Sequence, residues 1–250
     1  MPLVDVAGAP DLAAQLASLS CRLPVLVVGG PVADRVDRAT AAVRDGAHVL
    51  LAWPPAPSAD EADRLVRQAE EAGVEVGVMR PLGASGALAG LPDFRLVTVS
   101  LVAPVNSRLA AAGWQLALAG VIDVCMSLTG GRSASRLDVV GTRDGDALRA
   151  AALAARFDTG AYAQATIRYS ERAEAESVAV YAARPGDEVE AASLAAPLGE
   201  AADAALLADP DIAETAAFVA ALDDGHRAPL PLHQALATLR LVQRAERQLA

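Results

Sequence analysis

The chain has 250 residues, of which 53% are hydrophobic and only 3% aromatic, so its core is built mainly from Ala, Val and Leu. The formal net charge of −10 argues against a nucleic-acid-binding protein, which would carry a basic patch, and the two cysteines and three histidines lack the spacing of a metal site or a disulfide framework. Neither a secretory signal nor an apolar run of membrane-spanning length is present, so we expect a cytoplasmic protein without metal, membrane or nucleic-acid partners.

Short apolar runs alternate with helical periodicity in the first 80 residues. The predicted strands are 24–28, 49–51 and 74–79. Between them, apolar positions recur at helical spacing from Val32, and Ser58 with Glu61 forms a capping box that opens a second helix. Strands separated by helices of this length predict a parallel sheet.

The regular alternation of predicted strands and helices ends after residue 91. A strand is expected at 94–103 and a long apolar helix at 114–128, and four more strand candidates follow without intervening helices: 136–141, 150–157, 160–170 and 177–183. Helices are expected at 211–222 and 232–249. Consecutive strands of this kind predict a mostly antiparallel, open-faced sheet backed by helices, and the fold class is therefore α/β plus α+β.

Several segments, taken in order, resemble one known family. They are DGAHVLLAWPP, SADEADRLVRQAEEAGVEVGV, FDTGAYAQATIRYS, VAVYAARPGDEVE and the terminal PLPLHQALATLRLVQRAERQLA. The chain resembles the Gfo/Idh/MocA family of NAD(P)-dependent sugar and polyol oxidoreductases. The resemblance implies a Rossmann-like domain at 1–85 and an α+β domain at 86–250, whose terminal helix packs back on the first domain.

The cofactor signature of that family is missing. Its members open with a strand, a G-x-G-x-x-G turn and a helix, whereas residues 1–11 contain the single glycine Gly8. We therefore interpret the first domain as a truncated nucleotide-binding domain. Gly29 and Gly30 follow a strand and precede a helix, but without a third glycine they are weak candidates for cofactor binding. The expectation is that no cofactor binds, with NAD or NADP retained only if the site has been rebuilt.

The catalytic positions that the resemblance implies are also occupied by other residues. The lysine of the family's E-K-P motif aligns with Trp53, and the Asp and His of its D-x-x-x-H-x-x-D motif align with Leu116 and Gly120, leaving only Asp123. An indole carries no charge, and neither leucine nor glycine can accept a proton. We expect no catalytic residues and a cleft lined by Trp53, Trp114 and Asp123.

Three functions remain open at this stage. The favoured one is a non-catalytic member of the family, a pseudoenzyme that acts as a structural or interaction subunit. The second is an NAD(P)-dependent sugar or polyol oxidoreductase with a rebuilt or shared site. The third is a sugar- or polyol-binding protein without turnover, in which the tryptophans stack on a sugar face.

Strand alternation in GAYAQATIRYS indicates an interaction surface. Tyr162, Gln164, Thr166 and Arg168 lie on one face of the expected strand, opposite a face of small apolar residues. In the family this outer face is where subunits meet, so we expect a homodimer or higher oligomer formed through the second sheet. An intact relative is the alternative partner.

The turn TGGRSASR has two interpretations. Its hydroxyls and the guanidinium groups of Arg132 and Arg136 are candidates for cradling a phosphate. The favoured alternative is a helix that ends at Gly130, followed by solvated arginines.

Overall fold

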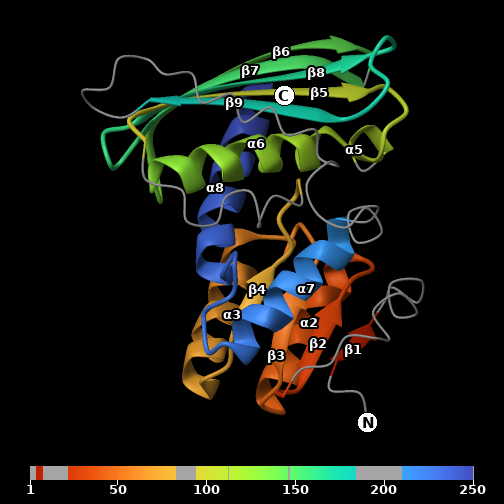
Figure 1. Cartoon of the computed structure of the whole chain (residues 1–250), viewed down its shortest axis with the longest axis vertical. Helices are drawn as coiled ribbons and strands as arrows, with labels where there is room; N and C mark the ends of the chain where they lie inside the picture. The colour runs from red at the N-terminus through yellow and green to blue at the C-terminus, as the bar shows by residue number, and fades with distance from the viewer. Residues whose placement is uncertain are drawn as a thin grey trace. The chain divides into compact units, whose positions relative to one another are not determined.

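A computed structural model describes residues 4–7, 22–82, 94–111, 113–145, 147–183 and 210–249. The chain divides into two compact units, shown in Figure 1. The first comprises Met1–Ala89 and Ala205–Leu236, and the second comprises Gly90–Ala204 and Ala237–Ala250. The segment 205–236 therefore belongs to the first unit although it lies in sequence between the two parts of the second.

The sheet of the first unit has four parallel strands. They are β1 (Val4–Ala7), β2 (Val25–Val28), β3 (His48–Leu51) and β4 (Val76–Val78), paired in the order β1-β2-β3-β4. Helix α2 (Val32–Arg44) joins β2 to β3, and α3 (Ala59–Ala72) joins β3 to β4. The parallel sheet predicted from the sequence is confirmed. Its strands all end at the same edge, which is where open α/β sheets bind ligands.

Both faces of this sheet are covered, as is usual for parallel sheets. One face packs on α2, α3 and the start of α8 (Leu232–Leu249) through a cluster that includes Val28, Leu51 and Leu65. The other face packs on α7 (Pro210–Asp223), whose Phe218 is fully buried beside Val25 and Val27.

The first turn of α3 confirms the capping box that the sequence predicts. The Ser58 hydroxyl accepts a hydrogen bond from the Glu61 backbone N–H at 3.3 Å and donates one to the Glu61 carboxylate at 2.8 Å. Gly73 ends the helix in the left-handed conformation, with φ of 68°. These contacts satisfy backbone groups that a helix terminus otherwise leaves without partners.

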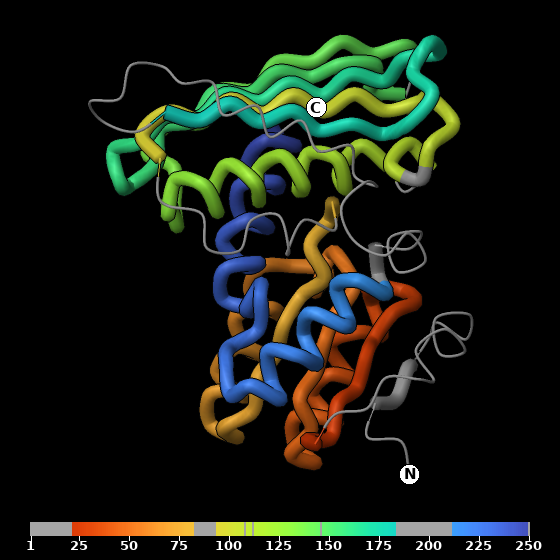
Figure 2. The backbone as a smooth tube through the Cα atoms, in the orientation of Figure 1, coloured from red at the N-terminus to blue at the C-terminus, as the bar shows by residue number. Residues whose placement is uncertain are grey.

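The second unit holds a five-stranded sheet, traced in Figure 2. Its strands are β5 (Leu96–Pro104), β6 (Ala134–Asp144), β7 (Ala147–Phe157), β8 (Tyr162–Ser170) and β9 (Ser177–Ala183). Their order is β6-β7-β8-β5-β9, and every pair is antiparallel except β5 with β8. Helices α5 (Arg108–Ala111) and α6 (Trp114–Thr129) cover one face, as Figure 1 shows for α6. The mostly antiparallel sheet backed by helices is confirmed.

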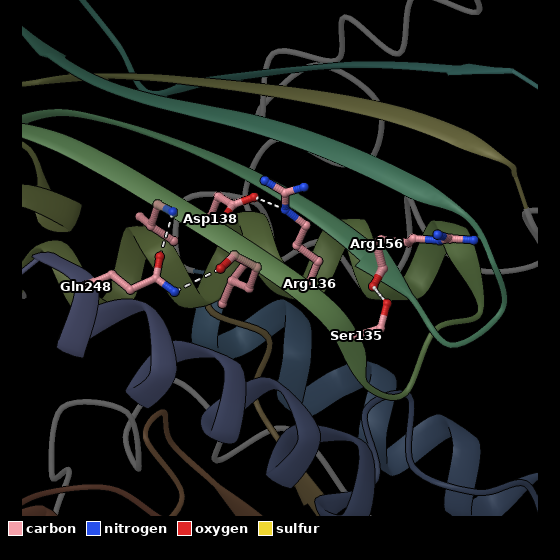
Figure 3. A network of polar contacts seen from close by, with 7 residues as sticks. Ser135, Arg136, Asp138, Arg156 and Gln248 are labelled. Carbon is pink, nitrogen blue, oxygen red and sulfur yellow. Dashed lines mark hydrogen bonds and ion pairs between the residues drawn. The ribbon is translucent and has the colours of Figure 1, made fainter.

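The C-terminal end of α8 protects the edge strand β6. The Gln248 amide accepts a hydrogen bond from the Val139 N–H and donates one to the Leu137 carbonyl, both at 2.8 Å (Figure 3). The Gln248 side chain thus satisfies backbone groups that an edge strand otherwise offers to other chains. None of the described helices is long and apolar enough to cross a bilayer.

A change at Gln248 tests this edge protection. Gln248→Met keeps the length of the side chain but removes both hydrogen bonds, so we expect the free energy of unfolding to fall by about 1–2 kcal/mol. Urea denaturation followed by circular dichroism measures the loss. An unchanged denaturation midpoint would show that water replaces the amide without cost.

Candidate functional site

Two turns lie side by side at the carboxyl edge of the parallel sheet. Strand β2 ends at Val28 and continues through Gly29-Gly30-Pro31 into α2, and β3 ends at Leu51 and continues through Ala52-Trp53-Pro54. Val28 pairs with Leu51, so the turns begin at the same level. Gly30 has φ of 74°, which a side-chain-bearing residue rarely adopts. The sequence-predicted residues Gly29, Gly30 and Trp53 are therefore brought together at this edge.

A buried arginine joins the two turns. Arg35 is only 8% exposed, and its Nε and Nη2 donate to the Gly30 carbonyl at 3.0 and 2.6 Å. Its Nη1 donates to the carbonyls of Ala52 at 3.1 Å and Pro54 at 2.6 Å. Sequence reasoning missed this residue. The available signal was its position on the apolar face of α2, one turn from Ala39.

A second buried arginine follows β4 at the same edge. The Arg80 backbone N–H donates to the buried Glu214 carboxylate at 3.1 Å, and its Nη2 donates to the Pro229 carbonyl at 3.1 Å. Arg80 and Glu214 come from distant parts of the chain, and no local pattern pairs them. They attach α7 and the segment that follows it to the end of β4.

In the sequence, Trp53 lies between Ala52 and Pro54, two of the three residues whose carbonyls Arg35 binds. Its side chain is half-buried and packs against the core cluster that includes Val28 and Leu51, and its peptide bond to Pro54 is cis. The indole therefore supplies an apolar surface at the strand ends. It has no ionisable group with which to move a proton.

The residues expected on α6 lie within the second unit. Gly120 and Asp123 are buried, Asp123 being 3% exposed, while Leu116 is half-buried. Burial, together with the Asp123 charge, raises the pKa of the Cys125 thiol to about 12. Trp114 at the start of the helix lies 5.7 Å from the Arg143 guanidinium. Trp53 belongs to the first unit, so the cleft expected between it and Trp114 stays a prediction.

The turn after α6, where the sequence allowed a phosphate site, binds the carboxylate of Asp158, a residue that follows β7. Gly130 ends α6 with φ of 62°, and the Arg132 N–H and the Ser133 hydroxyl both donate to the Asp158 carboxylate, at 3.1 and 3.2 Å. Partial desolvation raises the pKa of Asp158, but these hydrogen bonds outweigh it, so the pKa lies below its usual value. Of the groups expected to cradle a phosphate, the Ser133 hydroxyl therefore binds a carboxylate of the chain itself, and the Arg136 guanidinium pairs with the Asp138 carboxylate.

His48 gives the first unit a pH dependence. The Glu75 N–H donates to His48 Nδ1 at 2.9 Å, and burial lowers the pKa of His48 from 6.5 despite the nearby Glu75 charge. Below pH 6.5 the unfolded chain binds a proton that the folded chain resists, so stability should fall as the pH drops from 7 to 5. His48→Gln should flatten this slope in urea titrations, with the exposed His226→Gln as the matched control. If stability depends on pH equally in both variants, His48 is not the source of the pH dependence.

The comparisons identify the fold. Neither a protein-family profile nor a curated protein sequence matches the chain. Among solved structures, UDP-N-acetylglucosamine 3-dehydrogenase GnnA from Acidithiobacillus ferrooxidans superposes with a TM-score of 0.74 at 15% identity, covering 98% of this chain and 96% of its own. The fold is that of the Gfo/Idh/MocA-type dehydrogenases, as the sequence resemblance predicted.

Two further structures of this fold contain NAD. An oxidoreductase from Agrobacterium radiobacter, in complex with NAD+, L-tartaric acid and magnesium, has a TM-score of 0.69 at 13% identity, covering 98% of this chain and 87% of its own. GenD2 from gentamicin A biosynthesis, in complex with NAD, has a TM-score of 0.66 at 17% identity, covering 96% and 82%.

These structures overturn the sequence-based expectation that no cofactor binds, because they indicate a nucleotide cofactor for this fold. That expectation treated the loss of the G-x-G-x-x-G turn as the loss of the whole nucleotide site. The strand edge beside Gly29 and Gly30 is nevertheless present, with β2 and β3 ending together.

Proposed function

We propose that the chain is a cytoplasmic, nicotinamide-dinucleotide-binding member of the dehydrogenase fold that does not transfer hydride by itself and works as a subunit of an oligomer. The observation that carries the proposal is Trp53. It lies at the carboxyl edge of the parallel sheet, where open α/β sheets bind ligands, and the sequence resemblance aligns it with the family's lysine. An apolar ring at that point is compatible with binding but removes the charged group.

The strand edge suits the nucleotide chemically. Gly29 and Gly30 allow close approach to the backbone, and α2 begins without a side-chain cap, so its first N–H groups remain suited to an anionic group. Gly29, Gly30 and the first turn of α2 would hold the nucleotide. When bound, the nicotinamide ring supplies a hydride acceptor or donor.

The proton-transfer part of the reaction is what the chain lacks. Oxidising a hydroxyl requires a base that accepts its proton, with a pKa near the working pH. Trp53, Leu116 and Gly120 offer none, and Asp123 is almost completely buried. Binding and turnover are therefore separated in this chain.

An absorbance assay tests this separation. The purified chain, saturated with NAD+ and given a panel of sugars, polyols and UDP-sugars, should produce no increase at 340 nm, and Trp53→Lys should remain equally inactive. Turnover by the chain alone would overturn the non-catalytic assignment. Turnover by a mixture with an intact enzyme of the same fold that exceeds the turnover of that enzyme alone would favour a shared site.

The outer face of the second sheet is the proposed subunit interface. Tyr162 is 52% exposed on it, and Leu96 and Arg156 lie beside Tyr162 on the neighbouring strands. The Arg156 guanidinium lies 5.5 Å from the Tyr162 ring. These three side chains form a projecting row, here called the Tyr162 row, with the aromatic and arginine composition of interface anchors.

A hollow of about 550 Å³ lies further along the same face. Its floor consists mainly of small residues, including Ser100, Ala152 and Thr166, and Arg168 contributes to its lining. Thr166 is four residues from Tyr162 on β8, roughly 13 Å along the strand. A two-fold axis that lies between two facing sheets, parallel to them and perpendicular to β8 above Gln164, would bring the Tyr162 row of each copy over the hollow of the other. This self-complementarity supports a homodimer.

Light scattering and sedimentation velocity test the dimer. The wild-type chain should be dimeric at tens of micromolar, and both Tyr162→Glu and Arg168→Glu should produce monomers. Arg64→Glu, an exposed change on α3 in the other unit, is the matched control and should leave the mass unchanged. A monomeric wild-type chain would overturn the homodimer, and a mass gain only with an intact relative would replace it with a heterodimer.

A further inference from the structure

Arg35 is the one side chain that binds both turns at the carboxyl edge within the described part of the first unit. Four hydrogen bonds from a single guanidinium reach three carbonyls, two of them on either side of Trp53. Because the guanidinium is planar and rigid, these bonds fix the distance and the angle between the turns. The position of the indole ring follows from the backbone that carries it.

The bonds also change the electrostatics of the edge. The carboxyl ends of parallel strands present backbone carbonyls, whose partial negative charge repels anionic or electron-rich groups. Arg35 directs a full positive charge at the carbonyls of Gly30, Ala52 and Pro54. Its burial makes that charge more effective than a solvated one, because the local dielectric constant is lower.

We propose that Arg35 is the positioning residue of this edge: its guanidinium fixes the Gly30 turn, the Ala52–Pro54 turn and the Trp53 ring in the arrangement that receives the nucleotide. The nucleotide part of this statement rests on the proposed function. The part that concerns Trp53 stands on the hydrogen bonds alone.

The test uses a chain in which Trp53 is the only tryptophan, obtained with Trp114→Phe. In this background Arg35→Lys keeps the positive charge but cannot form the four hydrogen bonds that the planar guanidinium donates. Arg35→Met removes the charge as well. Arg38→Lys is the matched control, since Arg38 lies on the same helix and its partner is the exposed Asp34. Acrylamide quenching of Trp53 fluorescence is measured well below the melting temperature, with circular dichroism confirming the fold.

We expect the Trp53 quenching constant to rise about twofold in Arg35→Lys, because the turns then open locally without global unfolding, and to stay unchanged in Arg38→Lys. A merely structural role would lower the melting temperature of Arg35→Lys and leave the quenching below the transition unaltered, which would overturn the proposal. Should Arg35→Met fail to fold, Arg35→Lys still decides the question.

Calorimetric titration with NADH separates this proposal from the function on which it partly rests. Weaker NADH binding in Arg35→Lys than in Arg38→Lys is the expected result. Equal NADH affinity in the two variants would overturn the nucleotide part of the role. If neither the parent nor the variants bind NADH while quenching still rises, the proposed function fails and the positioning of Trp53 by Arg35 stands.

Discussion

Replacing Phe218 with alanine is expected to lower the free energy of unfolding of the first unit by about 3–5 kcal/mol. Phe218 is fully buried and packs with Val25, Val27, Leu50 and Met79 between α7 and the parallel sheet. Its removal leaves a cavity that rigid strands cannot fill. Guanidinium denaturation followed by circular dichroism measures the loss, and the exposed Leu23→Ala is a control that should change stability by less than about 0.5 kcal/mol.

A second change at Gly77 shows whether Phe218 packs as described. A Cβ at Gly77 would lie 2.8 Å from Phe218 Cε2, so Gly77→Ala should cost about 1–3 kcal/mol in the wild-type chain. In the Phe218→Ala background the added methyl group no longer meets the ring, so the cost should fall, and the part that remains comes from the Ala228 Cβ, 3.0 Å from the new Cβ. Additive costs in the double mutant would contradict the contact.

Phe157→Ala should have an effect of similar size in the second unit, again about 3–5 kcal/mol. Phe157 is 2% exposed and lies so close to Gly131 that a Cβ there would approach its Cγ to 2.7 Å. Gly131→Ala should therefore also destabilise this unit, since the Phe157 atoms nearest the backbone cannot move aside.

Calorimetry of the two phenylalanine variants assigns each effect to its unit. A chain with two compact units need not unfold in one step, so each transition must be followed separately. If the transitions are resolved, Phe218→Ala should lower one and Phe157→Ala the other. If both variants shift the same unfolding transition and leave the other transition unchanged, the division into two independently packed units is contradicted.

Local chemistry made much of the fold predictable. The capping box at Ser58 and the glycine at Gly73 bound α3 because both satisfy backbone groups within one turn of the helix. The burial alternation along β8 follows from its period of two. The packing of α7 on the first unit was not predictable, because the contact of Phe218 with Val25 and Val27 joins residues nearly 200 positions apart.

The candidate site was predictable only in part. Trp53 could be placed at a strand end from the apolar run and the prolines that follow it. The inward turn of Arg35 could not be foreseen, because its partners are backbone carbonyls that have no signature in the sequence. The prediction that no cofactor binds was wrong because it rested on the missing G-x-G-x-x-G turn and did not consider the strand edge beside Gly29 and Gly30.

Calorimetric titration of the wild-type chain with NADH tests whether the strand edge beside Gly30 binds a nicotinamide dinucleotide. We expect saturable binding with a dissociation constant in the micromolar range, one nucleotide per chain, and weaker binding when Gly30 is replaced by a bulky residue. The absence of measurable heat up to millimolar NADH would contradict it.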